Sequence, residues 1–192
     1  MFYWFAWVLC QIWFFLLGGV SYQGRENIPE TGAFIAAGNH RAGIDPFLLG
    51  MGLHRQMAFL AKDSLFRIPV VRTLLRWVNA TPINRSGSPK EVMDKTVELL
   101  KRGTLPTTIF PEGTRNLTED PLIPFKGGAA LLAIEAGVPI VPCAIVNSNR
   151  FFGHKVVRYG TPIQPPGEND KKARNDLTDA LRTAILDLLA GS

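Results

Sequence analysis

A histidine and an aspartate, separated by four residues, lie in the polar segment 39–46, which reads Asn-His-Arg-Ala-Gly-Ile-Asp-Pro. In a loop that doubles back, the Asp45 carboxylate can accept a hydrogen bond from one ring nitrogen of His40, which fixes the tautomer and makes the other nitrogen more basic. A general base held in this way contributes typically about 10²–10⁴-fold to a rate. The pattern therefore indicates a catalytic pair, with a structural loop histidine as the alternative.

No nucleophile of a familiar kind accompanies this pair. The sequence lacks a Gly-x-Ser-x-Gly elbow, and its two cysteines, Cys10 and Cys143, lie in apolar runs. We interpret both as small buried hydrophobes, which favours a reducing compartment. The three histidines, His40, His54 and His154, show no metal-binding spacing, so no metal site is predicted. A hydroxyl activated by His40 would then belong to a substrate.

The segment 110–115, Phe-Pro-Glu-Gly-Thr-Arg, is a second candidate for chemistry. Gly113 lets the backbone approach a ligand closely, Thr114 offers a hydroxyl, and Arg115 can hold a phosphate through two hydrogen bonds. Lys126 then opens a predicted helix whose free N–H groups also favour an anion. The alternative is a turn with a surface ion pair. The Walker pattern is missing, which argues against a nucleotide phosphate.

These polar segments follow short apolar runs, as loops follow the strands of an α/β protein. With 192 residues the chain suits one domain. Strands are expected at 33–37, 57–61, 81–84, 107–110 and 140–146, with an outer strand at 155–159, and helices at 46–53, 69–77, 89–102 and 127–136. An amphipathic helix carrying Leu177, Leu181, Ile185 and Leu188 closes the chain. We predict an α/β sandwich around a mostly parallel sheet, flanked by helices.

The start of the chain differs in character from the rest. Residues 1–24 carry no charge, and residues 1–20 hold eight of the nineteen aromatic residues. We divide the chain into a hydrophobic membrane-associating helix, 1–22, and a catalytic domain, 23–192. A helix of roughly 19 residues would cover about 28 Å, close to a hydrocarbon core of about 30 Å. Gln11, Trp7 and Trp13 would then lie deep in the bilayer, which favours a helix in the membrane surface. A buried helix of a soluble protein is the third possibility.

Basic residues are concentrated in one segment. The formal net charge is +5, and residues 55–85 alone contribute six basic residues against Asp63. The six are Arg55, Lys62, Arg67, Arg72, Arg76 and Arg85. Interleaved with apolar residues, they suit an anionic membrane surface or an acidic protein, with an ordinary solvated helix as the alternative. No nucleic-acid-binding motif is present, so nucleic acid is not expected as a partner.

Taken together, the motifs resemble those of the glycerolipid acyltransferases. The resemblance rests on Asn-His-x4-Asp-Pro, Phe-Pro-Glu-Gly-Thr-Arg, Phe-Lys-x-Gly and the segment 138–142, Val-Pro-Ile-Val-Pro, in that order, and spans roughly residues 23–165. Segment 79–85, which ends in Arg85, is similar to a weaker intermediate motif, and Lys62 also matches a family position. Ala42 departs from the pattern, since serine is frequent there, and this leaves the hydrogen bonding of the loop open.

The resemblance implies an acyltransferase fold and site residues but no metal or organic cofactor. His40 and Asp45 would be the catalytic pair. Substrate-binding residues would be Lys62, Arg85, Glu112, Gly113, Thr114, Arg115 and Lys126, with Glu112 and Arg115 at the glycerol phosphate and Lys62 or a backbone N–H near His40 as oxyanion donor.

The most similar group is the 1-acyl-glycerol-3-phosphate (lysophosphatidic acid) acyltransferases. The implied reaction transfers a fatty acyl group from acyl-CoA or acyl carrier protein to the free sn-2 hydroxyl of the acceptor. It gives phosphatidic acid for phospholipid synthesis at the cytoplasmic face of the cell membrane. Two alternatives remain: another acceptor, such as glycerol 3-phosphate, another lysophospholipid or a lyso-aminolipid, and a non-catalytic protein that binds acidic lipid.

Overall fold

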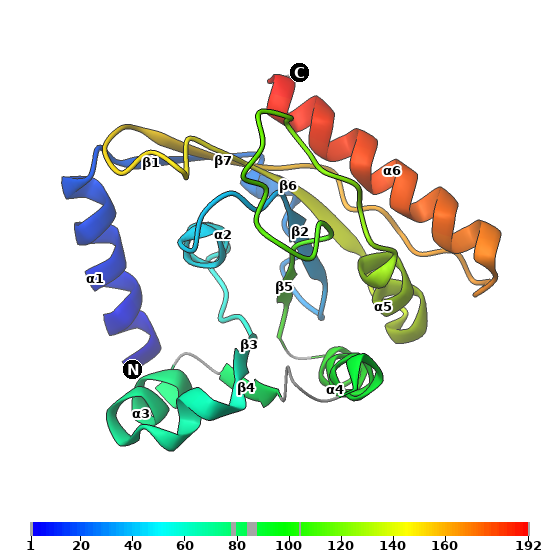
Figure 1. Cartoon of the computed structure of the whole chain (residues 1–192), viewed down its shortest axis with the longest axis horizontal. Coiled ribbons are helices and arrows are strands. Elements are labelled where there is room, and N and C mark those ends of the chain that lie inside the picture. The colour runs from blue at the N-terminus through cyan, green and yellow to red at the C-terminus, as the bar shows by residue number, and fades with distance from the viewer. Residues whose placement is uncertain (1, 78–79, 84–87, 104, 192) are drawn as a thin grey trace.

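The computed structural model describes residues 2–77, 80–83, 88–103 and 105–191. The chain forms three layers, with a twisted sheet between two layers of helices (Figure 1). The sheet has five strands in the order β1-β7-β6-β2-β5, and all its neighbouring pairs are parallel except β6 and β7. The predicted α/β class with a mostly parallel sheet is therefore confirmed. The strands are β1 (Val20–Gln23), β2 (Ile35–Gly38), β5 (Thr107–Ile109), β6 (Ile140–Val146) and β7 (Lys155–Tyr159).

Six helices are present in the described residues, together with a second, two-stranded parallel sheet. The helices are α1 (Phe2–Leu16), α2 (Asp45–Gly52), α3 (Pro69–Trp77), α4 (Pro89–Lys101), α5 (Gly128–Ala136) and α6 (Lys171–Ala190). The small sheet pairs β3 (Phe59–Lys62) with β4 (Ala80–Ile83). Two short 3-10 helices, η1 (Arg25–Asn27) and η2 (Asp63–Arg67), complete the elements.

Alternate residues of β2 enter two separate cores, because successive side chains of a strand point to opposite faces. Ile35 and Ala37 pack with α4, α5 and α6 on one face, where the predicted apolar stripe of α6 is buried. Phe34 and Ala36 pack with α2 and α1 on the other face. The central strand is thus buried on both sides, as expected in a parallel sheet.

One expectation about the sheet is wrong. Strand β7 was expected to be the outer strand, but it lies between β6 and β1. Strand β1 is the outermost strand on that side of the sheet and pairs in parallel with β7, from Val20 opposite Lys155 to Gln23 opposite Arg158. The proposed division between residues 22 and 23 falls within β1.

This topology gathers several loops at one edge of the sheet. Strands β2, β5 and β6 run in the same direction, so the loops that follow them meet at their carboxyl ends. Because β7 is antiparallel to β6, it begins at this same edge, and so does β1, which is parallel to β7. The end of α1 is thereby brought to the edge where the loop of His40 lies.

Helix α1 packs on the domain with one side only. Trp7 donates a hydrogen bond from Nε1 to the carbonyl of Met51 at 3.1 Å, and Phe14 is buried in the core. Large apolar side chains on the other side are exposed: Phe5, Val8, Ile12, Phe15 and Leu16. Within the described part of the chain, no helix combines the length and the hydropathy needed to span a bilayer.

Candidate active site

The position of His40 follows from the strand that precedes it. Strand β2 ends at Gly38, and the Asn39 side chain continues its pairing with β6: Nδ2 donates to the carbonyl of Ile145 at 3.0 Å, and Oδ1 accepts from the Ile145 N–H at 2.7 Å. Asn39 is buried, and its side chain takes the place of a backbone rung. The chain is therefore anchored at the residue immediately before His40.

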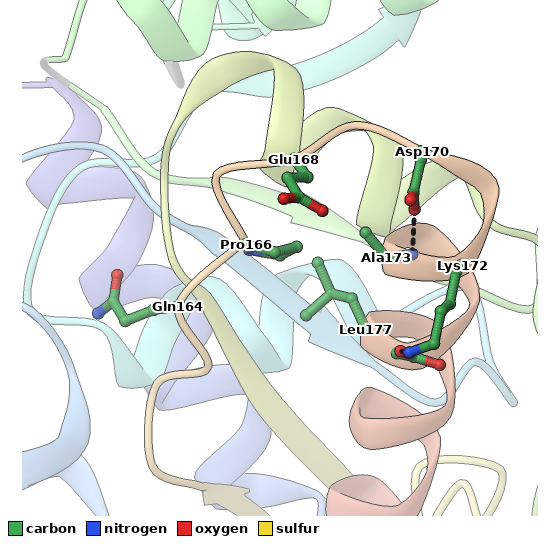
Figure 2. A pocket seen from close by; sticks show the side chains of 8 residues that line it. Gln164, Pro166, Glu168, Asp170, Lys172, Ala173 and Leu177 are labelled. Atoms are coloured by element: carbon green, nitrogen blue, oxygen red, sulfur yellow. Dashed lines mark hydrogen bonds and ion pairs between the residues drawn. The ribbon is translucent and has the colours of Figure 1, made fainter.

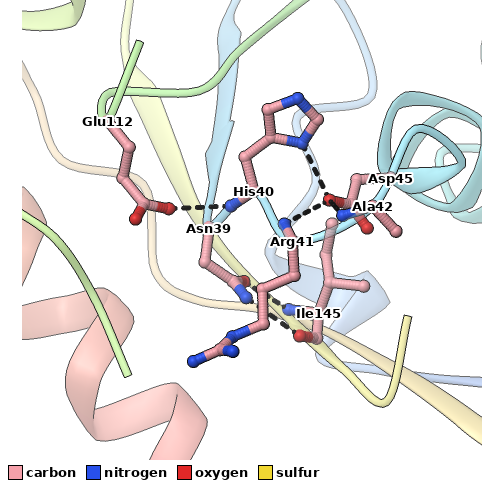
Figure 3. A network of polar contacts seen from close by, with 7 residues as sticks. All are labelled: Asn39, His40, Arg41, Ala42, Asp45, Glu112 and Ile145. Carbon is pink, nitrogen blue, oxygen red and sulfur yellow. Dashed lines mark hydrogen bonds and ion pairs between the residues drawn. The ribbon is translucent and has the colours of Figure 1, made fainter. Parts of the chain in front are cut away.

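His40 and Asp45 form the expected pair (Figure 3). Nδ1 of His40 lies 2.8 Å from Oδ2 of Asp45, and the Asp45 side chain is fully buried whereas that of His40 is 19% exposed. An ionised carboxylate can only accept hydrogen bonds, so Nδ1 carries the proton and Nε2 has a free lone pair. The ring turns Nε2 away from Asp45 (Figure 3). This arrangement provides a base whose free nitrogen points away from its carboxylate partner.

The same carboxylate oxygen also closes the loop. Oδ2 of Asp45 accepts from the backbone N–H groups of Arg41 and Ala42, each at 2.7 Å. Asp45 is also the first residue of α2, where a negative charge is favourable. Backbone groups thus bond the loop at Ala42, without the hydroxyl that a serine would supply. Because these two N–H groups are occupied, neither remains for an oxyanion.

Glu112 ties the His40 loop to the loop after β5. It is buried; its Oε1 accepts from the His40 N–H at 2.8 Å, and its Oε2 accepts from the Ile123 N–H at 3.1 Å. The sequence grouped Glu112 with the residues at the glycerol phosphate, but both of its oxygens are used inside the protein. The ring of Phe110 stacks on the imidazole with centroids 4.1 Å apart, which holds His40 from another side.

The remaining residues predicted for the phosphate are exposed. Thr114, Arg115 and Lys126 are exposed, and within the described residues none of their side chains has a hydrogen-bond partner. Gly113 adopts a φ of 70°, and a Cβ built on it would lie 2.9 Å from Cδ and Nζ of Lys126. The positive φ favours glycine at this position, while the flexible end of Lys126 lies directly against the Gly113 backbone. Two cations and a hydroxyl remain available to an anion.

Sequence reasoning missed the role of the Arg41 side chain. Its guanidinium donates to the carbonyls of Thr118 at 3.1 Å and Asp120 at 2.6 Å, and the N–H of Asn116 donates to the His40 carbonyl at 2.7 Å. The two loops are therefore joined by backbone acceptors. A residue pattern does not predict which carbonyls will accept these hydrogen bonds, since every residue type carries a backbone carbonyl.

The basic residues of segment 55–85 do not all form one exposed surface. Arg55 turns inward and donates to the carbonyls of Pro29 and Gly32, each at 2.8 Å, and burial lowers the pKa of its guanidinium. The backbone of Lys62 ends β3, while its side chain lies outside what the structure describes, as does the whole of Arg85.

The other described basic residues of segment 55–85 lie on η2 and α3. Arginines and apolar side chains are exposed there together: Arg67, Arg72 and Arg76 with Leu65, Ile68 and Val70. We refer to these six residues as the basic–apolar surface.

Two surface cavities lie away from the His–Asp pair. A hollow of about 390 Å³ lies between residues 164–170 and the start of α6, where Asp170 caps the helix by accepting from the Ala173 N–H at 2.6 Å (Figure 2). Another, of about 520 Å³, lies between the end of α1 and β1, beside His154. Neither is lined by a residue predicted to bind substrate. Among the described residues, no three His, Cys, Asp or Glu side chains are grouped as a metal site would require.

Comparison with known proteins places this geometry in a family. The model of the acyltransferase family matches residues 19–146. The 1-acyl-sn-glycerol-3-phosphate acyltransferases of Borreliella burgdorferi and Bacillus subtilis are 36% and 35% identical over 138 and 130 residues, or 70% and 67% of this chain. The chain spans 54% and 63% of the length of these two relatives.

A solved structure is also similar. The crystal structure of the 1-acyl-sn-glycerophosphate acyltransferase PlsC from Thermotoga maritima superposes with a TM-score of 0.70 at 26% identity, and the match covers 95% of this chain and 76% of that one. The matched family segment contains the His40–Asp45 pair, the loop 110–115 and Lys126. This chain therefore belongs to the acyltransferase family.

Proposed function

We propose that this protein transfers a fatty acyl group from an acyl thioester to the free sn-2 hydroxyl of 1-acyl-glycerol-3-phosphate, giving phosphatidic acid. One observation carries the proposal: the His40 imidazole is held by a buried carboxylate and by Phe110, and its second nitrogen points away from that carboxylate. The names of the similar proteins support lysophosphatidic acid as the acceptor. Acyl-CoA and acyl carrier protein both fit as the thioester.

In the proposed reaction, Nε2 of His40 removes the proton from the acceptor hydroxyl as its oxygen attacks the thioester carbonyl. The imidazole becomes positively charged for a moment, and the Asp45 carboxylate 2.8 Å away stabilises that charge. The tetrahedral intermediate then collapses, the carbon–sulfur bond breaks, and His40 returns the proton to the leaving thiolate. No acyl-enzyme is required, in keeping with a site that lacks a nucleophile of its own.

The oxyanion of the intermediate requires donors. Since the N–H groups of Arg41 and Ala42 are bonded to Asp45, we assign this role to Lys62. A lysine is suited to it as a mobile point charge at the end of a flexible stem.

The acceptor phosphate is assigned to Arg115, Lys126 and Thr114, with Arg85 as a further contributor. The first three are exposed next to the loop that Glu112 ties to His40, so one ligand can reach both the cations and the base. A guanidinium matches a phosphate through two parallel hydrogen bonds, and the lysine adds a second positive charge. Glu112 is a positioning residue in this scheme, because it acts through the backbone of His40.

We place the protein at the cytoplasmic face of the cell membrane, with α1 lying in one leaflet. Its 15 residues extend about 22 Å, and the exposed face of Phe5, Val8, Ile12, Phe15 and Leu16 suits the boundary between headgroups and acyl chains. The basic–apolar surface supplies attraction to anionic lipid. Because Trp7 and Phe14 pack on the domain, the helix would hold the domain against the bilayer rather than tether it loosely.

A turnover assay tests the proposed reaction. Purified protein is given a labelled acyl donor, as acyl-CoA and as acyl carrier protein, with lysophosphatidic acid, glycerol 3-phosphate, a lysophosphatidylcholine or a lyso-aminolipid dispersed in detergent. We expect turnover with lysophosphatidic acid that is abolished in His40→Ala. Turnover with another acceptor alone would reassign the substrate. Lipid binding without turnover, unchanged in His40→Ala, would support the non-catalytic alternative.

The membrane assignment is tested on the exposed face of α1 alone. Deleting the helix would uncover its packing site, so Ile12→Asn/Phe15→Asn is the better variant. We expect weaker binding to anionic vesicles, most of all at high salt, where the basic–apolar surface is screened. Activity on substrate in bilayers should fall far more than activity on substrate in detergent. Unchanged vesicle binding in high salt would rule out this role for α1.

A further inference from the structure

The loop between β6 and β7 exposes two adjacent phenylalanines. Phe151 and Phe152 are 66% and 71% exposed, and their rings pack edge to face with centroids 4.9 Å apart. The catalytic scheme uses neither of them. Two neighbouring aromatic rings held in water are costly for a soluble surface, because each can bury roughly 150–250 Å². Such an exposed pair is typical of a surface that something else covers.

The loop is held in shape by the protein beneath it. Lys155 is fully buried, and its Nζ donates to the carbonyls of Gly153 at 3.0 Å and Phe151 at 3.4 Å. The Asn147 side chain donates to the carbonyl of His154 at 3.1 Å, which closes the base of the loop. A buried ammonium group is costly unless it is hydrogen-bonded, so its use here fixes the backbone that carries the two rings.

The loop is also bonded to the end of α1. The Gly153 N–H donates to the carbonyl of Leu17 at 3.0 Å. A Cβ on Gly18 would lie 2.7 Å from the Gly153 carbonyl carbon, so the two backbones approach as closely as only glycine permits. Just before this junction, Phe15 and Leu16 are 78% and 70% exposed.

Two pairs of exposed apolar side chains therefore lie on neighbouring segments: Phe15 and Leu16 on α1, and Phe151 and Phe152 on the loop. In Figure 1 the loop before β7 lies beside the C-terminal end of α1, at the far end of that helix from α3.

The charged residues close to the two rings in the sequence are all basic. Arg150 precedes them and is exposed, and the sequence holds no acidic residue between Val138 and Gly167. Residues 1–24 carry no charge. Apolar rings beside a cation, in a segment that holds no acidic residue, match an anionic lipid surface, where the rings enter the headgroup region and the guanidinium pairs with phosphate.

We propose that the loop of Arg150, Phe151 and Phe152 is a second membrane-insertion point, which enters the same leaflet as α1. The proposal rests on the proposed function for its purpose, because an acceptor that stays in the bilayer is reached only by a domain held at the membrane. Four exposed side chains at the junction are a small patch for a stable dimer, which needs about 800 Å² per partner. A bilayer has no such minimum area. The loop and the adjoining α1, together with α3 near the other end of α1, would give the protein membrane contacts along one side.

The test is co-sedimentation with vesicles of phosphatidylcholine, with and without phosphatidylglycerol. Phe151→Ser/Phe152→Ser removes both rings, and we expect binding to weaken at least tenfold on the anionic vesicles. Arg150→Gln should weaken binding to the anionic vesicles only. The matched control removes no ring: Asn175→Ser/Ala180→Ser alters two exposed residues on α6, across the molecule from α1, and should bind as the unaltered protein does.

A second measurement reports insertion directly. An environment-sensitive dye at Phe152→Cys, in a Cys10→Ala background, should shift to the blue on the anionic vesicles, while the same dye at Ala180→Cys should not. Cys143 is buried and does not compete for the label. Equal binding of the serine pair and the unaltered protein, together with an unshifted dye at residue 152, would overturn the proposal.

Two further outcomes distinguish membrane insertion of the loop from dimer formation and from the proposed acyl transfer. If Phe151→Ser/Phe152→Ser lowers the sedimentation coefficient of the protein without vesicles and leaves its binding to vesicles unchanged, the rings join two copies of the chain. The lipid proposal is then wrong. If vesicle binding depends on the rings but the protein transfers no acyl group to detergent-dispersed lysophosphatidic acid, the proposed function fails and the insertion loop stands.

Discussion

The loop of His40 and the loop of Arg115 follow two neighbouring strands of one sheet, yet the protein uses their polar groups very differently. In the first, a single Asp45 oxygen accepts from His40 and from two backbone N–H groups. In the second, the side chains of Thr114, Arg115 and Lys126 have no partner within the described residues. The first loop is thus finished before a substrate arrives, apart from the buried Oδ1 of Asp45, which has no partner among the described residues. In the proposed function, the second loop would be completed by its ligand.

This difference separates two kinds of substitution. A change in the finished loop should lower the rate with substrate bound, and it should also destabilise the fold, because buried groups lose their partners. A change in the open loop should alter the affinity for the acceptor and leave the fold unaffected. Substitutions in each loop test this separation.

Replacing His40 by alanine has the largest expected effect. No other side chain at the site can take the proton from the acceptor, so kcat should fall by about 10²–10⁴-fold, measured as acyl transfer to lysophosphatidic acid in detergent. The exposed His54, outside the site, serves as the control. His54→Asn suits its φ of 44°, since asparagine tolerates this conformation, and should leave turnover unchanged.

The double variant with Asp45 asks whether the pair acts as one unit. Asp45→Ala leaves an imidazole without orientation, so its loss of kcat should equal or be smaller than that of His40→Ala, and it should lower the melting temperature. The double variant should be little worse than His40→Ala alone. Losses that multiply would show that the two residues act independently.

Glu112→Gln should behave as a change in the finished loop, although Glu112 belongs to the Glu-Gly-Thr-Arg segment. A glutamine presents one acceptor to two N–H donors, so the bond to either His40 or Ile123 is lost, at a cost of roughly 1–3 kcal/mol in the free energy of unfolding. We expect a lower kcat with a nearly unchanged KM for the acceptor. Glu98→Gln, at an exposed position, is the control. A large change in KM without loss of stability would return Glu112 to the phosphate.

Arg115→Lys should behave as a change in the open loop. Lysine keeps the charge but lacks the planar fork, so the KM for lysophosphatidic acid should rise by roughly tenfold, or about 1.4 kcal/mol. The KM for the acyl donor and the melting temperature should not change. Arg102→Lys, at the C-terminal cap of α4, controls for the exchange at an exposed arginine. A rise confined to the donor KM would assign this loop to the other substrate.

The smallest effect concerns stability alone. Burial lowers the pKa of Lys155 below 10.5, so between that lowered value and 10.5 the unfolded chain holds a proton that the folded chain has lost. The free energy of unfolding should therefore rise with pH in this range, by at most about 1.4 kcal/mol per pH unit. In Lys155→Met this rise should disappear, as denaturant titrations at several pH values can measure. A rise that persists in the variant would have another origin.

The sequence predicted those parts of the site that depend on local pattern. The strand before His40, the helix that begins near Asp45 and the strand 140–146 are all formed by continuous apolar runs with clear ends. Strand β1 was missed because it has only four residues between two glycines, and its partner lies about 135 residues further along the chain. Its existence therefore depends on β7, and no local pattern carries that information.

The site residues divide in the same way. The His40–Asp45 contact was predictable because four intervening residues allow only a tight loop. The inward turn of Arg55 and the two bonds of Glu112 were not, since each depends on backbone groups from distant segments. Charged residues in the sequence therefore suggested ligand contacts that the folded chain satisfies internally.

The antiparallel entry of β7 has a consequence for the energetics of substrate exchange. Had β7 run parallel to β6, the end of α1 would lie at the opposite edge of the sheet from His40. A lipid in the leaflet that α1 contacts would then have to leave the bilayer in order to reach His40. Moving a chain of about 16 carbons into water costs roughly 0.8 kcal/mol per methylene, about 12 kcal/mol in all. In the proposed function, one reversed strand removes that barrier, so that the acceptor reaches its base by lateral diffusion.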